Sequence, residues 1–382
     1  MDSAQKLIML PGPTNVSERV MGAMLGPVIN HRGDTFREMY KGVLDKVRHL
    51  FQTEGEVVVF SSSGTGGVEA AVWNLIRPGD VAVVPVFGEF SSRLAESVEM
   101  AGGRAVQVRS ESGRVPSIEE LKGSMDQMKN FKALFLVHNE TSTGVAVPYV
   151  EEASKMARDH GAFAVVDAIS SLGGYSIPVD GWGVDVCITG SQKCIAAPPG
   201  LALLSVSKDV VDFLKGSPPK TRYFEIPRYL EYGARGETPF TPALPLFYAL
   251  DEALKELLEE GLAKRVQRHD RMSALLYDGL ARLGLGPVSE RAVRSKTVIA
   301  SYYPEGVEDA KFRKSLAHDK GIVIAGGFGP FAGKVCRVGC MGQINEGFVD
   351  RTLKAMGETL AGSRNAPKSI NPTEWSVKSH GA

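Results

Sequence analysis

The chain has 382 residues, of which 43% are apolar and 23% are charged, a composition typical of a globular protein large enough for two domains. Lysine and arginine together number 44, as do aspartate and glutamate, so the formal net charge is zero. There is no basic excess of the kind that favours nucleic acid or an anionic membrane surface. We therefore expect neither a nucleic acid nor a membrane as a partner.

The amino terminus has only a short apolar run, which Pro11 interrupts, and no basic leader precedes it. Such a start is unlike a secretory signal, and the longest apolar runs are far too short to cross a bilayer. We therefore expect a cytoplasmic protein. The four cysteines are expected to be small buried residues rather than a disulfide framework or a metal site.

Short apolar runs alternate with helical patterns through the first two-thirds of the chain. The runs contain few polar positions, which is typical of strands that are covered on both faces. The predicted strands are 57–60, 81–86, 134–138, 163–167, 186–189 and 201–206, and the predicted helices between them are 67–76, 91–101 and 149–160. This alternation predicts an α/β layout with a mainly parallel sheet.

The pattern changes after Leu214, where proline-containing loops lead into two long helices. The predicted helices are 245–260, 262–283, 309–320 and 346–360, and the predicted strands are 297–302, 321–324 and 335–338. The mixture suits a smaller α+β C-terminal domain. The predicted organisation is an N-terminal arm (1–20), a large domain (21–255), a small domain (256–361) and a flexible tail (362–382).

The predicted strand ends carry groups that can do chemistry, and ligands of open α/β sheets bind at the carboxyl ends of strands. The loop Ser61–Gly67 precedes a helix and can offer backbone N–H groups to a phosphate. Asp167 ends an apolar strand, so it would be desolvated unless it is paired, and Lys193 follows the next strand. Singly, these features suit an ordinary helix start, a helix cap and a surface lysine. Together they are the groups needed to hold pyridoxal phosphate.

Nucleotide cofactors fit the glycine-rich loop less well. Glu69 stands where the third glycine of a dinucleotide-binding fingerprint belongs, which disfavours a nicotinamide dehydrogenase. No lysine follows the glycines, so the loop is not a P-loop either.

Motifs spread over residues 8–360 resemble those of the class V aminotransferases, in particular the alanine–glyoxylate/serine–pyruvate type. The matching segments are 11–14 (PGPT), 63–65 (SGT), 138–144 (HNETSTG), 166–174 (VDAISSLGG), 190–193 (GSQK), 198–200 (PPG), 238–242 (TPFTP) and 337–342 (RVGCMG). Their order and their coverage make the resemblance specific. It implies the fold of PLP-dependent transferases of fold type I, with pyridoxal phosphate as the cofactor.

The resemblance also implies roles for individual residues. Lys193 would form the Schiff base with the cofactor and transfer the substrate proton, and Asp167 would keep the pyridine nitrogen protonated. The other implied cofactor-binding residues are Ser63, Gly64, Thr65, Phe90, Thr141, Gln192 and Thr241. Phe90 would stack on the ring, and Thr241 would reach the phosphate of a neighbouring subunit, which implies a homodimer with shared active sites.

Two arginines are the implied substrate-binding residues. Arg337 would bind the α-carboxylate with its planar fork. Arg32 would either contact a second acidic group or brace the amino-terminal segment.

The implied reaction is a ping-pong exchange of an amino group between a small amino acid, alanine or serine, and a 2-oxo acid, glyoxylate or pyruvate. Aspartate and 2-aminoethylphosphonate aminotransferases of the same family remain alternatives. A cysteine desulfurase is disfavoured, because Cys336 and Cys340 are expected in a strand and a turn rather than on a long flexible loop. The presence of Lys193 and Asp167 argues against a non-catalytic scaffold.

Overall fold

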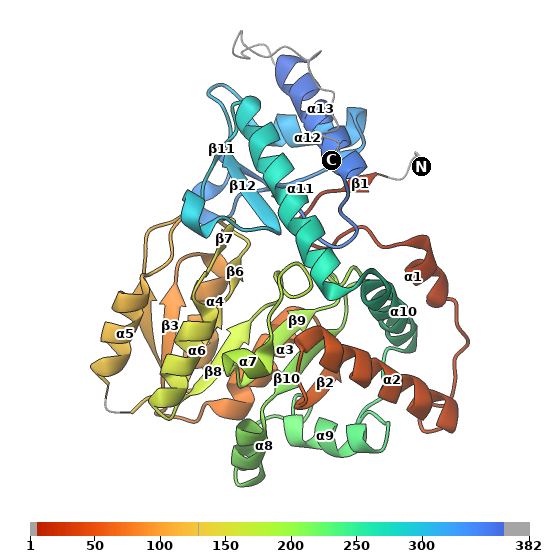
Figure 1. The fold of residues 1–382 in the computed structure, drawn as a ribbon, viewed down its shortest axis with the longest axis vertical. Coiled ribbons are helices and arrows are strands. Elements are labelled where there is room, and N and C mark those ends of the chain that lie inside the picture. Colours follow the sequence, from red (N-terminus) through yellow and green to blue (C-terminus); the bar gives the residue numbers. More distant parts are fainter. Residues whose placement is uncertain (1–5, 129, 363–382) are drawn as a thin grey trace.

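The computed structural model describes residues 6–128 and 130–362, and its central feature is a seven-stranded sheet of order β2-β10-β9-β8-β5-β3-β4 (Figure 1). Its strands are β2 (Glu56–Phe60), β3 (Val81–Val86), β4 (Arg104–Arg109), β5 (Ala133–Val137), β8 (Phe163–Asp167), β9 (Val186–Gly190) and β10 (Ala202–Val206). Neighbouring strands are parallel except at β10, which runs antiparallel to both β2 and β9. The predicted mainly parallel α/β sheet is confirmed.

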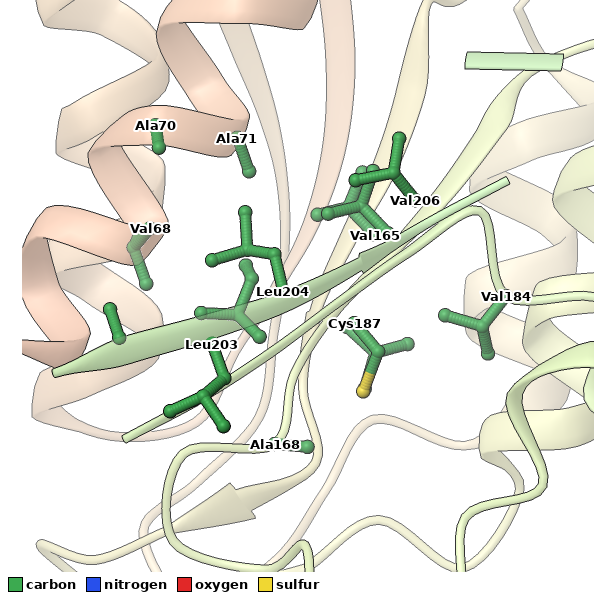
Figure 2. Packing of buried hydrophobic residues seen from close by; sticks show 14 of the residues in the cluster. Val68, Ala70, Ala71, Val165, Ala168, Val184, Cys187, Leu203, Leu204 and Val206 are labelled. Atoms are coloured by element: carbon green, nitrogen blue, oxygen red, sulfur yellow. The ribbon is translucent and has the colours of Figure 1, made fainter. Parts of the chain in front are cut away.

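Helices pack against this sheet through small and β-branched side chains. α3 (Gly64–Leu75) lies on β9 and β10, α4 (Glu89–Met100) on β3 and β4, and α6 (Val150–Asp159) on β8. Figure 2 shows Val68 and Ala71 of α3 facing Leu204 of β10. The approach is close, because a Cβ added at Gly67 would lie 2.9 Å from Ile188 Cγ2.

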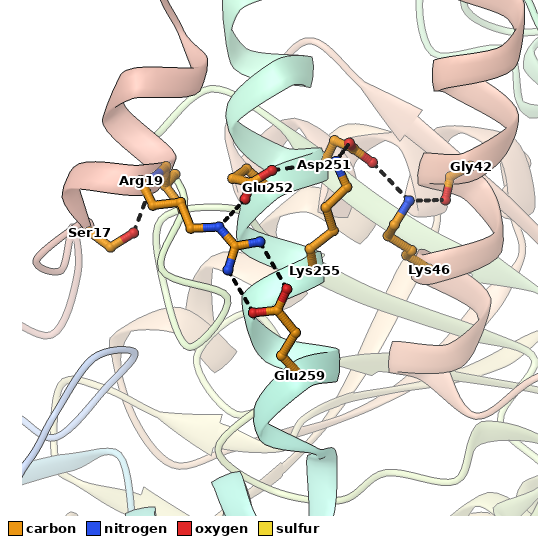
Figure 3. Close-up of polar contacts among 9 residues, drawn as sticks. Ser17, Arg19, Gly42, Lys46, Asp251, Glu252, Lys255 and Glu259 are labelled. Atoms are coloured by element: carbon orange, nitrogen blue, oxygen red, sulfur yellow. Dashed lines mark hydrogen bonds and ion pairs between the residues drawn. The ribbon is translucent and has the colours of Figure 1, made fainter.

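Further helices surround the edge of the sheet that begins with β2. They are α1 (Glu18–Ala23), α2 (Asp34–Phe51), α7 (Val179–Trp182), α8 (Lys208–Lys215), α9 (Ile226–Ala234) and α10 (Leu244–Glu260), and α5 (Ile118–Asp126) lies near β3 and β4. The apolar face of α2 packs on α10, where the rings of Tyr40 and Phe247 are 5.6 Å apart. On the polar side, Arg19 of α1 pairs with Glu252 and Glu259 of α10 (Figure 3).

A smaller four-stranded antiparallel sheet, of order β11-β12-β15-β14, lies toward the carboxyl end of the chain. Its region comprises α11 (Leu262–Arg282), β11 (Gly286–Pro287), β12 (Val298–Tyr302), α12 (Asp309–Asp319), β13 (Ile322–Val323), β14 (Ala325–Gly326), β15 (Val335–Gly339) and α13 (Glu346–Gly362). Short pieces complete the list: β6 (Asn139–Glu140), β7 (Val145–Ala146) and the 3-10 turns Arg291–Val293 and Gly329–Phe331. The second sheet and its helices have the α+β character that the sequence predicts.

The first strand joins this C-terminal region. β1 (Leu7–Ile8) pairs in parallel with β13, and Leu7 and Met9 are buried in the apolar cluster of the smaller sheet. A larger apolar cluster surrounds the seven-stranded sheet. The domain limits at residues 20, 255 and 361 stay predictions. Of the predicted flexible tail (362–382), Gly362 is the last residue of α13, and the rest lies outside the described residues. Within residues 6–128 and 130–362, no helix is both long enough and apolar enough to span a membrane.

Candidate active site

The carboxyl ends of the parallel strands open onto a cavity of about 160 Å³. Eight residues that the sequence singles out line it: Ser63, Gly64, Thr65, Phe90, Thr141, Asp167, Gln192 and Lys193. Asp167 ends β8, and the other seven come from segments that follow β2, β3, β5 and β9. The sheet therefore brings together groups that lie up to 130 residues apart in the chain, and the fold explains their convergence.

Lys193 lies in a turn three residues after β9, and its side chain is only partly exposed. Its ammonium group donates a hydrogen bond to the carbonyl oxygen of Pro11. Gly12 packs directly on the lysine, since a Cβ at Gly12 would lie 2.8 Å from Nζ. Burial lowers the pKa of Lys193 to about 8, against the opposing effect of Asp167. A fraction of the amine is therefore neutral near neutral pH, as a nucleophile or a proton carrier must be.

Asp167 is the last residue of β8 and is 8% exposed. One carboxylate oxygen accepts a hydrogen bond of 2.9 Å from the backbone N–H of Ile169. Burial raises the pKa of Asp167 to about 6, and nearby Glu140 adds to the rise, while Lys193 opposes it. A cation held against this carboxylate would lower its pKa and keep it ionised.

The first turn of α3 forms a cradle for an anion. Ser63 precedes the helix in an extended conformation and makes no side-chain cap hydrogen bond. The N–H groups of a first helical turn lack intrahelical partners and favour negative charge. At Gly64 an added Cβ would lie 2.8 Å from Ile169 Cδ1, so a larger residue would crowd the cavity wall. The position and the backbone geometry suit a phosphate.

Two amide side chains in the cavity wall lack partners for a buried oxygen. The Oε1 of Gln192 and the Oδ1 of Asn139 have no hydrogen-bond partner within the described residues. Buried polar atoms normally have hydrogen-bond partners, so these two oxygens can accept hydrogen bonds from a ligand in the cavity. Asn139 was not predicted from the sequence.

Glu140 is a second residue that the sequence analysis missed, although it lies in the HNETSTG motif. It is fully buried, and its Oε2 accepts hydrogen bonds of 3.0 Å from the backbone N–H groups of Phe90 and Ser91. Its Oε1 accepts hydrogen bonds from the backbone and the hydroxyl of Ser142, at 3.1 and 2.6 Å. This carboxylate therefore fixes the start of α4 and the backbone from which the Phe90 ring projects.

Arg337 lies in β15 next to the cavity and is 6% exposed. Its Nε donates to the carbonyl of Gly326 at 2.7 Å, and its Nη1 donates to the carbonyl of Thr141 at 3.2 Å. The ring of Phe328 covers the guanidinium at 4.1 Å. Burial lowers the pKa of Arg337 to about 10, so the group stays charged at neutral pH. Two of its five N–H donors are used in these contacts, which leaves others for a carboxylate.

Arg32 and Thr241 do not line the cavity of this chain. Nη1 of Arg32 donates to Glu237 Oε2 at 2.8 Å and to the carbonyl of Thr238 at 2.7 Å. Of the two roles that the sequence leaves open for Arg32, the single chain shows a bracing contact. Thr241 is exposed, and its contact with a neighbouring subunit stays a prediction.

Comparison with known proteins identifies the family to which this arrangement belongs. The sequence profile of the family "Aminotransferase class-V" matches residues 18–340. The chain belongs to the class V aminotransferases. An uncharacterized aminotransferase of Methanocaldococcus jannaschii is 39% identical over 355 residues, which cover 92% of each chain. A serine–glyoxylate aminotransferase of Methylorubrum extorquens is 34% identical over 350 residues, covering 89% of this chain and 87% of that one.

A solved structure supports the same assignment. The crystal structure of an alanine–glyoxylate aminotransferase from Nostoc sp. has a TM-score of 0.90 and 31% identity to this chain. The match covers 94% of this chain and 96% of that chain. This class V aminotransferase therefore has the predicted fold type I of PLP-dependent transferases.

Pyridoxal phosphate is the cofactor of this aminotransferase family, and the cavity fits it. The first turn of α3 suits its phosphate, Asp167 suits its ring nitrogen, and Lys193 suits its aldehyde. The unpaired amide oxygens of Gln192 and Asn139 show that the wall has hydrogen-bonding capacity still to be used. The individual roles of these residues stay predictions.

Proposed function

We propose that this class V aminotransferase exchanges an amino group between alanine or serine and a small 2-oxo acid, glyoxylate or pyruvate, in a ping-pong reaction. The observation that supports it best is that Lys193 and Asp167 line one cavity and that Arg337 lies beside it. These residues supply an amine, a carboxylate and a guanidinium. Relatives whose names state an amino donor include a serine–glyoxylate and an alanine–glyoxylate aminotransferase.

Each of the three residues would have a separate task. Arg337 would hold the substrate α-carboxylate and thereby orient the Cα–H bond. Lys193, with its lowered pKa, would hold and release the proton at the substrate Cα. Asp167 would keep the positive charge on the ring nitrogen, and the bound cofactor would supply the electron sink that makes the Cα proton acidic.

The aromatic surroundings of Arg337 support a small substrate. Phe328 covers the guanidinium, and its ring meets the ring of Phe90 edge to face at a distance of 6.2 Å. Arg93 in turn lies over the Phe90 ring at 5.4 Å. We infer that these side chains, which lie beside the carboxylate site, favour the side chains of alanine and serine over longer ones.

We propose further that the enzyme works as a homodimer with shared active sites. Large apolar side chains are exposed on and after α1, with Leu25 88% exposed and Val28 89% exposed. The ion pairs of Arg19 with Glu252 and Glu259 hold α1 against α10 (Figure 3). The apolar segment after α1 stays exposed. A second copy would bury the segment and bring the exposed Thr241 to the phosphate of its neighbour.

Comparison of amino donors tests the proposed substrates. The purified enzyme with pyridoxal phosphate is assayed with alanine, serine, aspartate and 2-aminoethylphosphonate, each with glyoxylate and with pyruvate. We expect the highest kcat/KM with alanine or serine, and no turnover in the control variant Lys193→Ala. Turnover of aspartate or of the phosphonate alone would contradict the proposed donors and favour the alternatives in the same family.

Sulfide release from cysteine, measured in the same preparation, tests the desulfurase alternative. Cys336 is buried within β15, and Cys340 is buried directly after it. Burial raises the pKa of the Cys336 thiol to about 12, and the pKa of Cys340 also lies well above its usual range. Neither thiol is therefore a ready nucleophile, and we expect no sulfide release.

A further inference from the structure

A buried arginine outside the cavity holds the turn that carries Lys193. Arg265, near the start of α11, is 1% exposed, and its Nη2 donates a hydrogen bond of 2.6 Å to the carbonyl oxygen of Cys194. Cys194 directly follows the lysine. In the same turn Ala196 is buried and has a φ of +63°, a conformation that non-glycine residues rarely adopt. Such a turn persists only where its surroundings hold it.

The same arginine is linked to the segment that follows Arg337. Nη1 of Arg265 pairs with Glu260 Oε2 at 2.8 Å, and the Nε of Arg268 pairs with Glu260 Oε1 at 2.6 Å. Nη1 of Arg268 then donates to the carbonyl oxygens of Gly342 and Ile344. These carbonyls lie in the loop directly after β15, the strand of Arg337.

The two held segments touch one another. A Cβ added at Gly342 would lie 2.9 Å from the Cβ of Ala196 and 3.5 Å from the carbonyl oxygen of Lys193. The hydroxyl of Thr14 also approaches that carbonyl, at 3.4 Å. Glu260 thus pairs with both arginines. Arg265 holds the turn that contains Lys193, and Arg268 holds the loop after β15, the strand of Arg337.

We propose that Glu260, Arg265 and Arg268, here called the arginine clamp, are positioning residues that set Lys193 relative to Arg337. The inference rests on the proposed function, in which Lys193 acts on a substrate held by Arg337. None of the three residues lines the cavity, so the clamp acts through the backbone of Cys194 and Gly342. A displacement of about 1 Å at a reacting group can lower a rate about 100-fold, so a loosened turn should have a kinetic effect.

The first test replaces Arg265 and compares it with a matched control. Arg265→Met removes the grip on the Cys194 carbonyl. Arg158→Met removes an arginine that pairs at 2.6 Å with the buried Asp185, at the amino-terminal end of β9, away from the cavity. We expect both to lower the Tm. Only Arg265→Met should raise the Kd for pyridoxal phosphate, lower kcat about tenfold or more, and shift the pH at which the absorption of the bound cofactor changes.

Conservative and separate replacements make the test specific. Arg265→Lys can contact Cys194 or Glu260 with its single amine, so it should recover part of the cofactor affinity. Arg268→Met releases only the loop after Arg337, so it should raise the KM for the amino donor while the Kd for the cofactor stays within about twofold. If Arg265→Met does not fold, the donor KM of Arg268→Met alone tests the inference.

The outcomes separate this inference from the proposed function. If Arg265→Met and Arg158→Met change the Tm alike and leave the cofactor Kd and the kinetics within about twofold, the clamp is only structural and the inference is wrong. If Arg268→Met leaves the donor KM unchanged, the link to Arg337 is wrong. A wild-type enzyme that binds pyridoxal phosphate but uses neither alanine nor serine would contradict the proposed donors. The cofactor Kd and the absorption titration would still test the grip on Lys193.

Discussion

Glu140 illustrates how a single buried carboxylate can organise a cofactor site without lining its cavity. It accepts hydrogen bonds from Phe90, Ser91 and Ser142, and its charge raises the pKa of Arg337 against the effect of burial. Hydrogen bonds to a charged group typically contribute about 1.5–3 kcal/mol each to stability. The hydrogen bonds of this carboxylate are therefore strong enough to fix the position of the Phe90 ring.

Replacing Glu140 with glutamine tests this role. The amide keeps the size of the side chain but offers an NH₂ group to the N–H donors of Phe90 and Ser91. We expect the Kd for pyridoxal phosphate to rise about tenfold, which corresponds to about 1.4 kcal/mol. If Glu140 acts through the Phe90 ring, the double variant Glu140→Gln/Phe90→Leu should bind only slightly worse than Phe90→Leu alone. Full additivity, or an unchanged Kd for Glu140→Gln, would contradict the assignment.

Lys193 should lower the stability of the cofactor-free protein in a pH-dependent way. Its pKa falls from 10.5 in the unfolded chain to about 8 in the folded one, because burial disfavours the charge. Between these values the unfolded chain binds more protons, so stability rises with pH. Below about pH 8 the folded chain must hold a buried charge. We expect Lys193→Met to raise the Tm by about 2–4 °C at pH 7.

Calorimetry of the cofactor-free proteins at pH 7 and pH 10 checks this expectation. The gain from Lys193→Met should be smaller at pH 10, where the folded lysine is already neutral. An equal gain at both pH values would mean that the lysine is not desolvated as the structure indicates.

The side chains that the sequence identifies and those that it misses differ in a physical way. Lys193 and Asp167 follow apolar strands, so their unusual placement is visible in the local pattern. Glu140 and Arg265 are recognisable only by partners that lie far away in the chain, at Phe90 and Cys194. No local pattern shows a hydrogen bond that forms across the tertiary structure.

The amino-terminal strand segment contacts the amine of Lys193 directly. β1 pairs with β13, the N–H of Gly339 donates to the carbonyl of Met9 at 2.8 Å, and Pro11 accepts the hydrogen bond from Lys193. A Cβ at Gly339 would overlap the carbonyl oxygen of Leu10. The segment and β15 are therefore packed backbone against backbone.

Gly339→Ala should push this segment away from β15. We expect a loss of about 3 kcal/mol in the free energy of unfolding, because backbone atoms cannot move aside as a flexible side chain can. The measurement is urea denaturation, with Gly286→Ala as the control, since a Cβ at Gly286 would meet no atom of the described residues within 4 Å. Equal stability of the two variants would show that the close packing is absent in solution.

Most strands of the seven-stranded sheet were predictable, but the helices α1, α2, α5, α7, α8 and α9 were not predicted. The strands at 81–86 and 163–167 have the bounds that the sequence predicts, because runs of buried β-branched residues are typical of central strands. β4 was missed, because Arg104–Arg109 is a half-buried edge strand whose apolar residues are interrupted by polar ones. The antiparallel direction of β10 was also not predictable, since an apolar run carries no information about its direction.

In the proposed dimer, each chain would contribute a residue to the active site of the other. Leu25 and Val28 are almost fully exposed, although large apolar side chains are costly to leave in water. We expect the wild-type enzyme to elute as a dimer in size-exclusion chromatography. Leu25→Glu/Val28→Glu should shift it to a monomer and raise the Kd for pyridoxal phosphate about tenfold or more, because Thr241 would no longer reach its neighbour's phosphate site.

A matched pair of exposed charge changes provides the control. Glu54→Gln/Glu111→Gln alters two exposed surface positions away from α1 and should leave the elution unchanged. A wild-type monomer with full activity would contradict the shared-site proposal, although it would leave the fold and the lysine assignment intact.

The claim on which the account depends is that Lys193 is the residue that holds pyridoxal phosphate covalently. Borohydride reduction of the enzyme with its bound cofactor, followed by peptide mass spectrometry, tests it most directly. The account predicts the reduced cofactor on the peptide that contains Lys193, and no labelled peptide in Lys193→Ala. A label on a different lysine, or an unlabelled protein despite stoichiometric cofactor binding, would contradict it.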